Sequence, residues 1–260
     1  MASEAEDNKG AVKALLHRQA VEELYDDYAE TFEQHLVGGL GYCGPEVIAR
    51  LAEGFLSRRE QHVPLDTVVD LGCGTGLCGK AVRHLTKHLI GIDLSEGMLN
   101  VAREKGCKGS PGGEGSLFDQ TIVADAAVGL GKLLPNSVDL VVAGDVFIYV
   151  WSVERVFAAC ARALRTDGLL IFTSESLEEG TAPEGWIERE SERYAHCRSF
   201  LTQHCEKQGL HVEHCEAVAL RREPGSIGKD DDSHEPCAPW IPADVFVARK
   251  ELLSFGNWLL

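Results

Sequence analysis

Hydrophobic positions along the chain follow two spacings that alternate. Short runs of apolar, often β-branched residues are typical of strands buried on both faces of a sheet. Segments with apolar residues three or four apart are typical of helices. The strand-like runs are 67–71, 88–93, 121–124, 137–143 and 168–176, and the helix-like segments are 80–86, 95–105 and 153–164. This alternation predicts right-handed βαβ units and a mostly parallel sheet with helices on both faces.

Two further helices are predicted before the first strand-like run. Residues 17–36 place apolar side chains on one helical face, and a second helix begins near Pro45, after a glycine-rich turn. The tyrosines of the first helix, Tyr25 and Tyr28, either pack on the core or line a pocket. Tyr42, in the glycine-rich turn, is a further candidate for covering a ligand.

The C-terminal third changes character. Residues 194–209 are predicted to be helical, while 211–223 and 240–250 are predicted to be two strands joined as an antiparallel hairpin at the sheet edge. We expect a single domain over 17–250, with 17–60 as an N-terminal helical cap and 223–241 as a mobile, acidic insert. Residues 1–16 are expected to be a flexible acidic N-terminus, and 251–260 a C-terminal tail.

Charge and cysteine content narrow the class of protein. The chain has 260 residues and a formal net charge of −16, which argues against nucleic acid or an anionic membrane as partner, because both require a basic surface. No apolar run has the ~18 residues of a membrane span, and the N-terminus has no secretory pattern. The nine cysteines are best explained as reduced thiols. A cytoplasmic location is expected, and an organellar one stays open.

The stretch 67–79, TVVDLGCGTGLCG, combines a strand, glycines and the start of a helix. Glycines allow a positive φ and a close approach of ligand to backbone, so this order is typical of a nucleotide-binding turn. Two patterns overlap here. Gly74, Gly76 and Gly79 satisfy GxGxxG of dinucleotide sites, whereas Asp70 with Gly72, Gly74 and Gly76 satisfies DxGxGxG of S-adenosylmethionine (SAM) sites.

Acidic residues stand at the ends of four successive strands and favour the second pattern. Asp70, Asp93, Asp125 and Asp145 stand at these ends, and an acid about 20 residues after the glycines can accept both ribose hydroxyls. A helix N-cap is the commoner use of any one of them. Carboxylates suit the cationic groups of SAM better than they suit a pyrophosphate.

Together, DLGCGTG, IDLS, VADA, VDLVVAGDVFIYV and ALRTDGLLIFTSE resemble the motifs of class I SAM-dependent methyltransferases. The resemblance implies a Rossmann-like, seven-stranded sheet ending in an antiparallel hairpin. The segments YDDYAETFEQHLVGGLGY, RYAH and ALRRE are closest to the tetratricopeptide-repeat-linked predicted methyltransferases, although the repeats themselves are absent. The longer linker 229–243 also departs from the short turn of that group.

The resemblance assigns roles by position. Asp70, Gly72, Cys73, Gly74 and Gly76 would form the loop under the methionine portion of SAM. Asp93 would hold the ribose, with Leu94 against the adenine. Asp125 and Ala126 would contact the adenine edge, and Asp145 would face the transferring methyl group.

The acceptor side is less specified. Candidate substrate-binding residues are Tyr25, Tyr28, Tyr42, Tyr149 and Arg221, and candidate general bases are Asp145, Tyr149, Tyr194 and His196. The Cys/His-rich stretch 196–215 does not match a zinc spacing, so no metal site is expected. Thiols that hold a metalloid acceptor stay an alternative.

We therefore expect a SAM-dependent methyltransferase that acts on a small molecule, with a protein substrate as an alternative. The two rival interpretations are an NAD-dependent oxidoreductase and a non-catalytic SAM-binding protein.

Overall fold

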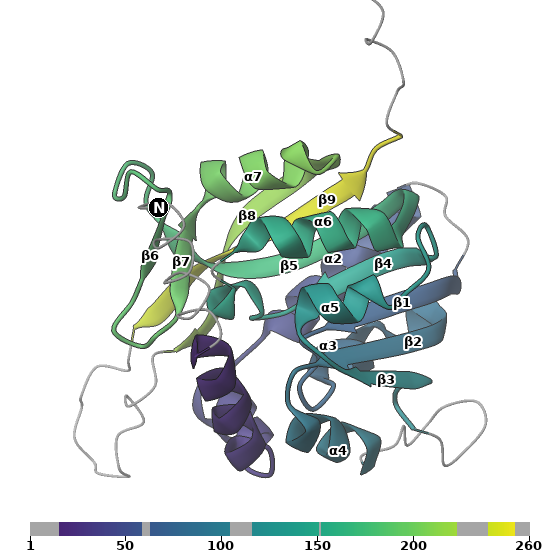
Figure 1. Ribbon diagram of the computed structural model, residues 1–260, viewed down its shortest axis with the longest axis horizontal. Coiled ribbons are helices and arrows are strands. Elements are labelled where there is room, and N and C mark those ends of the chain that lie inside the picture. The colour runs from purple at the N-terminus through teal and green to yellow at the C-terminus, as the bar shows by residue number, and fades with distance from the viewer. Residues whose placement is uncertain (1–15, 59–62, 105–115, 151, 223–238, 253–260) are drawn as a thin grey trace, which may run out of the picture.

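A mixed β-sheet, with parallel and antiparallel strands and with helices on both faces, forms the body of the molecule (Figure 1). The structure is a computed structural model that describes residues 16–58, 63–104, 116–150, 152–222 and 239–252. The parallel strands lie in the order β3-β2-β1-β4-β5. Their bounds are β1 Leu65–Leu71, β2 Thr86–Asp93, β3 Gln120–Val123, β4 Val138–Ala143 and β5 Leu164–Leu177.

The remaining strands continue the sheet beyond β5. β9 (Trp240–Lys250) runs antiparallel to β5 and to β8 (Leu210–Arg222), which confirms the expected C-terminal hairpin. β7 (Tyr194–Cys197) pairs in parallel with the last residues of β5, and β6 (Trp186–Glu188) pairs antiparallel with β7. These two short strands were not predicted from the sequence.

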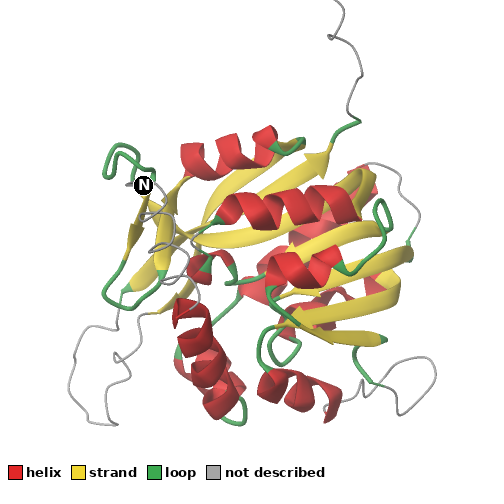
Figure 2. Cartoon of the chain, in the orientation of Figure 1, coloured by secondary structure: helices red, strands yellow, loops and turns green. Residues whose placement is uncertain are grey.

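The helices form two layers, one on each face (Figure 2). α2 (Gly44–Arg58), α3 (Leu77–Val82) and α4 (Glu96–Glu104) pack on one apolar core. α5 (Ala126–Gly131), α6 (Val153–Ala163) and α7 (Arg198–Lys207) cover the other, which holds the contacting rings of Phe147, Phe157 and Phe172. Within the described ranges, no helix has both the length and the apolar character needed to cross a bilayer.

Residues 16–28 form a further helix, here called the cap helix, that lies outside both layers (Figure 1). It ends eight residues before the predicted end at position 36, and a short π-helical segment, Gln34–Gly39, follows. Asp26 attaches the helix to α4, since its Oδ1 accepts hydrogen bonds from Ser95 Oγ and from Gly97 N. Glu33 Oε1 accepts one from Thr75 Oγ1 at 2.6 Å.

The prediction of a helix over 194–209 is wrong at its start. Tyr194, Ala195, His196 and Cys197 are all buried in β7, because pairing with β5 and β6 satisfies their backbone groups. Cys197 and Cys205 therefore do not share a helix as predicted, since α7 begins only at Arg198.

Smaller boundary differences have local causes. The helix predicted over 80–86 is α3, which begins at Leu77 and ends at Val82. It ends earlier than predicted because Thr86 already belongs to β2. The short helix α5 was not predicted. The expected insert at 223–241 falls mostly on residues 223–238, which lie outside the described residues, as do 1–15 and 253–260.

Candidate functional site

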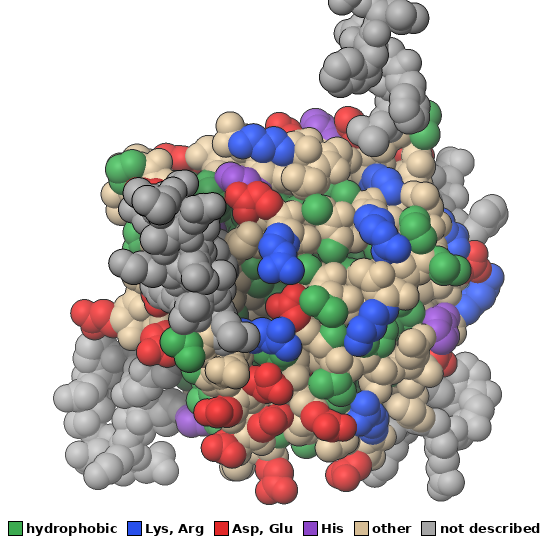
Figure 3. Space-filling model, in the orientation of Figure 1, with side chains coloured by type: hydrophobic (Ala, Val, Ile, Leu, Met, Phe, Trp, Pro, Cys, Tyr) green, Lys and Arg blue, Asp and Glu red, His purple; other side chains and the backbone are tan. Residues whose placement is uncertain are grey.

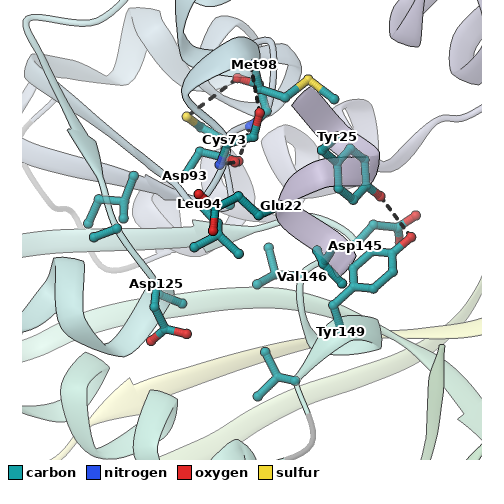
Figure 4. A pocket seen from close by; sticks show the side chains of 18 of the residues that line it. Glu22, Tyr25, Cys73, Asp93, Leu94, Met98, Asp125, Asp145, Val146 and Tyr149 are labelled. Atoms are coloured by element: carbon teal, nitrogen blue, oxygen red, sulfur yellow. Dashed lines mark hydrogen bonds between the residues drawn. The ribbon is translucent and has the colours of Figure 1, made fainter. Parts of the chain in front are cut away.

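A cavity of about 680 Å³ opens at the carboxyl ends of β1, β2, β3 and β4, beneath the cap helix. The parallel register aligns these ends, since Leu71 pairs with Ile92 and Asp93 with Val123. Figure 4 shows Asp93 and Asp125 on one side, with Tyr25, Tyr149 and Asp145 on the other. This is the place where parallel α/β sheets bind ligands.

The glycine turn after β1 presents bare backbone to the cavity. Gly72, Gly74 and Gly76 all have positive φ, at 63°, 51° and 93°. A Cβ on Gly72 would come within 2.4 Å of a Val146 methyl group, so no other residue fits there. Ile92 O accepts hydrogen bonds from Gly72 N and Cys73 N, at 2.7 and 3.0 Å, and these bonds fix the turn against β2. Gly72, Cys73 and Gly74 line the cavity.

Asp93 organises the same turn from the end of β2. Its Oδ2 accepts a hydrogen bond from Gly74 N at 2.7 Å, and its Oδ1 accepts one from Ser95 N at 2.9 Å. Burial raises the pKa of this carboxyl, and the backbone donors oppose that shift. A carboxylate oxygen can accept more than one hydrogen bond, so Asp93 can hold the turn and still receive a ligand hydroxyl.

Asp70 occupies a different place from the other strand-end acids. It is 1% exposed and is not among the residues that line the cavity. Its Oδ2 accepts from Gly79 N at 2.6 Å, while its Oδ1 has no hydrogen-bond partner among the described residues. Burial raises its pKa to about 8. Asp70 therefore ties the turn to α3 from behind.

Asp125 is the N-cap of α5 and also stands at the cavity, so the two uses that the sequence left as alternatives are compatible. Its Oδ1 accepts hydrogen bonds from Ala127 N and Val128 N, at 3.1 and 3.4 Å, as the N-cap of α5. The same residue lines the cavity with Ala126 and with Leu94.

Asp145 lies at the other end, within a buried ionic network. Its φ is +54°, and its Oδ2 accepts a hydrogen bond from Arg221 Nε at 2.7 Å. Arg221 Nη2 donates to Glu175 at 2.7 Å, and Glu175 also pairs with Arg189. Of these four residues, Asp145 alone lines the cavity. Arg221, a predicted substrate ligand, instead fixes Asp145.

Tyr25 and Tyr149 join the cap helix to η3 (Phe147–Tyr149). The two hydroxyl oxygens are 2.8 Å apart, and both side chains line the cavity together with Tyr42. Burial raises the pKa of all three tyrosines, so each keeps its proton at neutral pH.

The structure does not bring three other candidates to the cavity: Tyr28, Tyr194 and His196. Burial lowers the pKa of His196 to about 4, and its Nδ1 lies 2.9 Å from Ser174 Oγ. His196 is therefore a neutral core residue.

The Cys/His-rich stretch 196–215 also lies apart from the cavity, whose lining cysteines are Cys73 and Cys78. Among the described residues, no three His, Cys, Asp or Glu side chains form a group that could hold a metal.

Several lining residues were missed. Arg18 and Glu22 lie two turns and one turn before Tyr25 on its helical face, so the spacing contained a signal for them. Arg155 lies on α6 beside the apolar residues from which that helix was predicted. The hydrophobic pattern gave no indication that its side chain would line a cavity.

The part of the chain that builds this site is similar to methyltransferase domains. Residues 69–172 match the family model described as a methyltransferase domain. This span runs from β1 to β5 and contains the glycine turn, Asp93, Asp125 and Asp145.

Among curated proteins, a probable SAM-dependent methyltransferase of Saccharomyces cerevisiae is 35% identical over 108 residues, 41% of this chain and 34% of that protein. A ubiquinone biosynthesis O-methyltransferase of Idiomarina loihiensis is 28% identical over 121 residues, 46% of this chain and 47% of that protein. The chain thus spans less than half the length of either relative.

Solved structures share the fold over more of the chain. Magnesium protoporphyrin IX methyltransferase of Synechocystis PCC 6803, with bound SAM, has a TM-score of 0.60 at 14% identity and covers 90% of this chain and 97% of its own. A methyltransferase in complex with the Trm112 activator of Haloferax volcanii has a TM-score of 0.59 at 19% identity and covers 88% and 98%.

These comparisons confirm the predicted Rossmann-like fold class, and they support a class I methyltransferase domain with SAM as its cofactor. The closer likeness to the tetratricopeptide-repeat-linked group stays a prediction, as does the cytoplasmic location.

Proposed function

We propose that the protein is a SAM-dependent methyltransferase that methylates a small molecule in the cavity beneath the cap helix. The observation that carries the proposal is the juxtaposition of a bare glycine turn and two acids, Asp93 and Asp125, with the Tyr25–Tyr149 pair at the opposite side. One side suits a nucleoside, and the other leaves room for an acceptor.

The residues present fit SAM. The backbone of the glycine turn lines the cavity at Gly72 and Gly74, where no side chain stands between it and a ligand. The cavity volume of about 680 Å³ is within the ~300–1,000 Å³ of small-molecule sites. Gly72 and Gly74 would contact the methionine portion, Asp93 the ribose hydroxyls, and Leu94 with Asp125 the adenine. When bound, SAM supplies a methyl group activated by its sulfonium.

The remaining catalytic work falls to this chain's own residues. The cap helix lines one side of the cavity, and Tyr25 and Tyr149 line its acceptor side. Methyl transfer would therefore depend chiefly on how these residues orient the donor and the acceptor. Asp145, held by Arg221, is the lining carboxylate nearest in sequence to Tyr149. It is the candidate base when the acceptor must lose a proton.

SAM binding is tested by titration calorimetry with SAM and with NADH. We expect SAM to bind and NADH not to bind, and the reverse result would favour the oxidoreductase. Asp93→Asn should weaken SAM binding about 10- to 100-fold, as expected for the loss of a charged hydrogen-bond acceptor worth ~1.5–3 kcal/mol.

Asp66→Asn is the matched control for that variant. Asp66 is an exposed acid near the start of β1, at the opposite end of the sheet from the cavity, where it pairs with Lys87. SAM affinity should be unchanged in it. Equal affinities in the two variants would show that the ribose site has been misassigned.

Turnover distinguishes an enzyme from a SAM-binding protein. Labelled methyl groups should pass from SAM to a component of a small-molecule extract. Transfer to proteins alone would favour a protein substrate instead, and SAM binding without transfer to either would favour the non-catalytic alternative.

A further inference from the structure

Two arginines stand apart from the others in the part of the chain that the structure describes. Arg221, Arg249 and Arg165, for example, all bond to carboxylates. Arg18 and Arg155 have no hydrogen bond, ion pair or ring contact with any described residue. Both line the cavity, and both are exposed, so they lie at its rim.

Their lack of a partner among the described residues is unusual in this chain. The sequence holds 41 acidic residues against 25 lysines and arginines, so carboxylates are plentiful. Figure 3 shows acidic side chains gathered over the cap helix and α4, at the lower edge of the face that it displays. Two guanidinium groups at one cavity that no described carboxylate neutralises, on such a surface, are available to a ligand.

The charge of the other residues that line the cavity indicates what the two arginines could bind. Glu22, Asp93, Asp125 and Asp145 are acidic, and the net charge of −16 repels anions at long range. A neutral or cationic acceptor would need no guanidinium at the rim. An anionic acceptor would need local positive charge to enter.

The two arginines come from separate elements that meet at the cavity. Arg18 lies on the cap helix, seven residues before Tyr25, and Arg155 lies on α6, six residues after Tyr149. The hydroxyl groups of these tyrosines are hydrogen-bonded at 2.8 Å. An anion held by both guanidinium groups would therefore hold the cap helix against the body of the domain.

We propose that the methyl acceptor carries an oxyanion, a carboxylate or a phosphate, which Arg18 and Arg155 bind at the rim of the cavity. This proposal rests on the proposed function, because it concerns the acceptor of that reaction. The planar guanidinium matches the geometry of both anions and binds them through paired N–H···O bonds.

The test uses three small probes of similar shape: benzoate, phenyl phosphate and uncharged benzamide. Each is titrated into the full chain loaded with S-adenosylhomocysteine. We expect at least one anion to bind at least tenfold more tightly than benzamide. The stronger of the two anions identifies the group. Equal binding of all three, or no binding of either anion, would overturn the proposal.

Variants assign the preference to these residues. Arg155→Gln and Arg18→Gln should each reduce anion affinity at least fivefold, and Arg155→Lys should retain part of it. Arg162→Gln is the matched control, since Arg162 lies on the same helix and donates to Leu133 O, outside the cavity. Unchanged anion affinity in both glutamine variants would overturn the assignment.

Cofactor binding separates failure of this proposal from failure of the proposed function. Both glutamine variants should bind SAM as the unmodified chain does. If they lose SAM affinity instead, the arginines serve the cofactor and the acceptor proposal is wrong. If the unmodified chain binds no SAM, the proposed function fails, and the same probes titrated into the unloaded chain still test the anion site.

Discussion

Tyr25 donates a hydrogen bond to the hydroxyl oxygen of Tyr149 across 124 residues of sequence, with 2.8 Å between the two oxygens. The rings meet edge to face, with their centroids 5.6 Å apart and an angle of 87° between their planes. Because burial keeps both hydroxyl groups protonated, Tyr149 accepts one bond and retains its own proton. One contact thus attaches the cap helix and leaves a hydrogen-bond donor at the cavity.

Tyr25→Phe should loosen the cap helix. The variant removes the bond and leaves a part-buried hydroxyl on Tyr149 without its partner, at a cost of about 1 kcal/mol. Backbone amides of residues 16–28 should therefore exchange hydrogen several-fold faster, as measured by mass spectrometry.

Tyr28→Phe is the control for that measurement. Tyr28 lies on the same helix and packs edge to face on Phe32, and its hydroxyl group makes no hydrogen bond with the described residues. Exchange over 16–28 should match that of the unmodified chain. Equal acceleration in both variants would mean that the hydroxyl pair does not attach the helix.

Arg221→Leu should destabilise the fold strongly. Arg221 is 3% exposed and bonds to both Asp145 and Glu175, so its loss leaves the buried carboxylate of Glu175 and the part-buried carboxylate of Asp145 without this cation. Breaking such a pair typically costs about 3–5 kcal/mol. Urea denaturation should show this loss in the free energy of unfolding.

Arg50→Leu is the comparison, because it removes an exposed pair with Glu216, which lies on β8 as Arg221 does. Exposed pairs contribute about 0–1 kcal/mol, so the free energy of unfolding should change little. Similar losses in Arg50→Leu and Arg221→Leu would contradict the importance of the buried network.

Gly72→Ala should impair the cofactor site. The added Cβ would meet a Val146 methyl group at 2.4 Å, and φ at this position is +63°. We expect SAM affinity to fall more than tenfold, as measured by calorimetry. Gly54→Ala is the matched control, because Gly54 lies in α2 with nothing within 4 Å of a Cβ. That change should instead stabilise the helix by about 0.5–1 kcal/mol.

Asp70 should make stability depend on pH. The folded chain holds this proton up to a pKa of about 8, whereas the ordinary value is 3.8. Between these values the folded state binds more protons than the unfolded state, so the free energy of unfolding falls as pH rises. Asp70→Asn should remove this decline. Urea denaturation at pH 5 and at pH 8.5 measures it, and parallel behaviour of both proteins would refute the assignment.

Local pattern predicted the parallel part of the sheet because most residues of β1, β2, β4 and β5 are buried, so these strands read as apolar runs, although the edge strand β3 is partly exposed. Val68, Val69 and Leu71, for example, are fully buried, so the apolar runs in the sequence correspond to β1 through β5. The acids at strand ends were likewise predictable from the sequence, because each stands at the end of such a run or shortly after it.

What the pattern missed depends on distant partners. Residues 194–197 carry no strong strand signal and become β7 only through pairing with β5 and β6. The position of Asp70 behind the turn follows from its bond to Gly79 N, which no spacing reveals. Arg18 and Arg155 lie 137 positions apart in the sequence, and only the cap helix brings them to one cavity.

The cap helix has a consequence for the order in which the protein is made. Residues 16–28 leave the ribosome well before their partners Ser95, Gly97 and Tyr149. A helix this short is marginal in water without tertiary contacts, since isolated helices below ~12–15 residues scarcely persist. The helix that covers the cavity is therefore synthesised before the residues on which it packs, and a chain stalled before η3 would lack the Tyr149 hydroxyl group to which Tyr25 bonds.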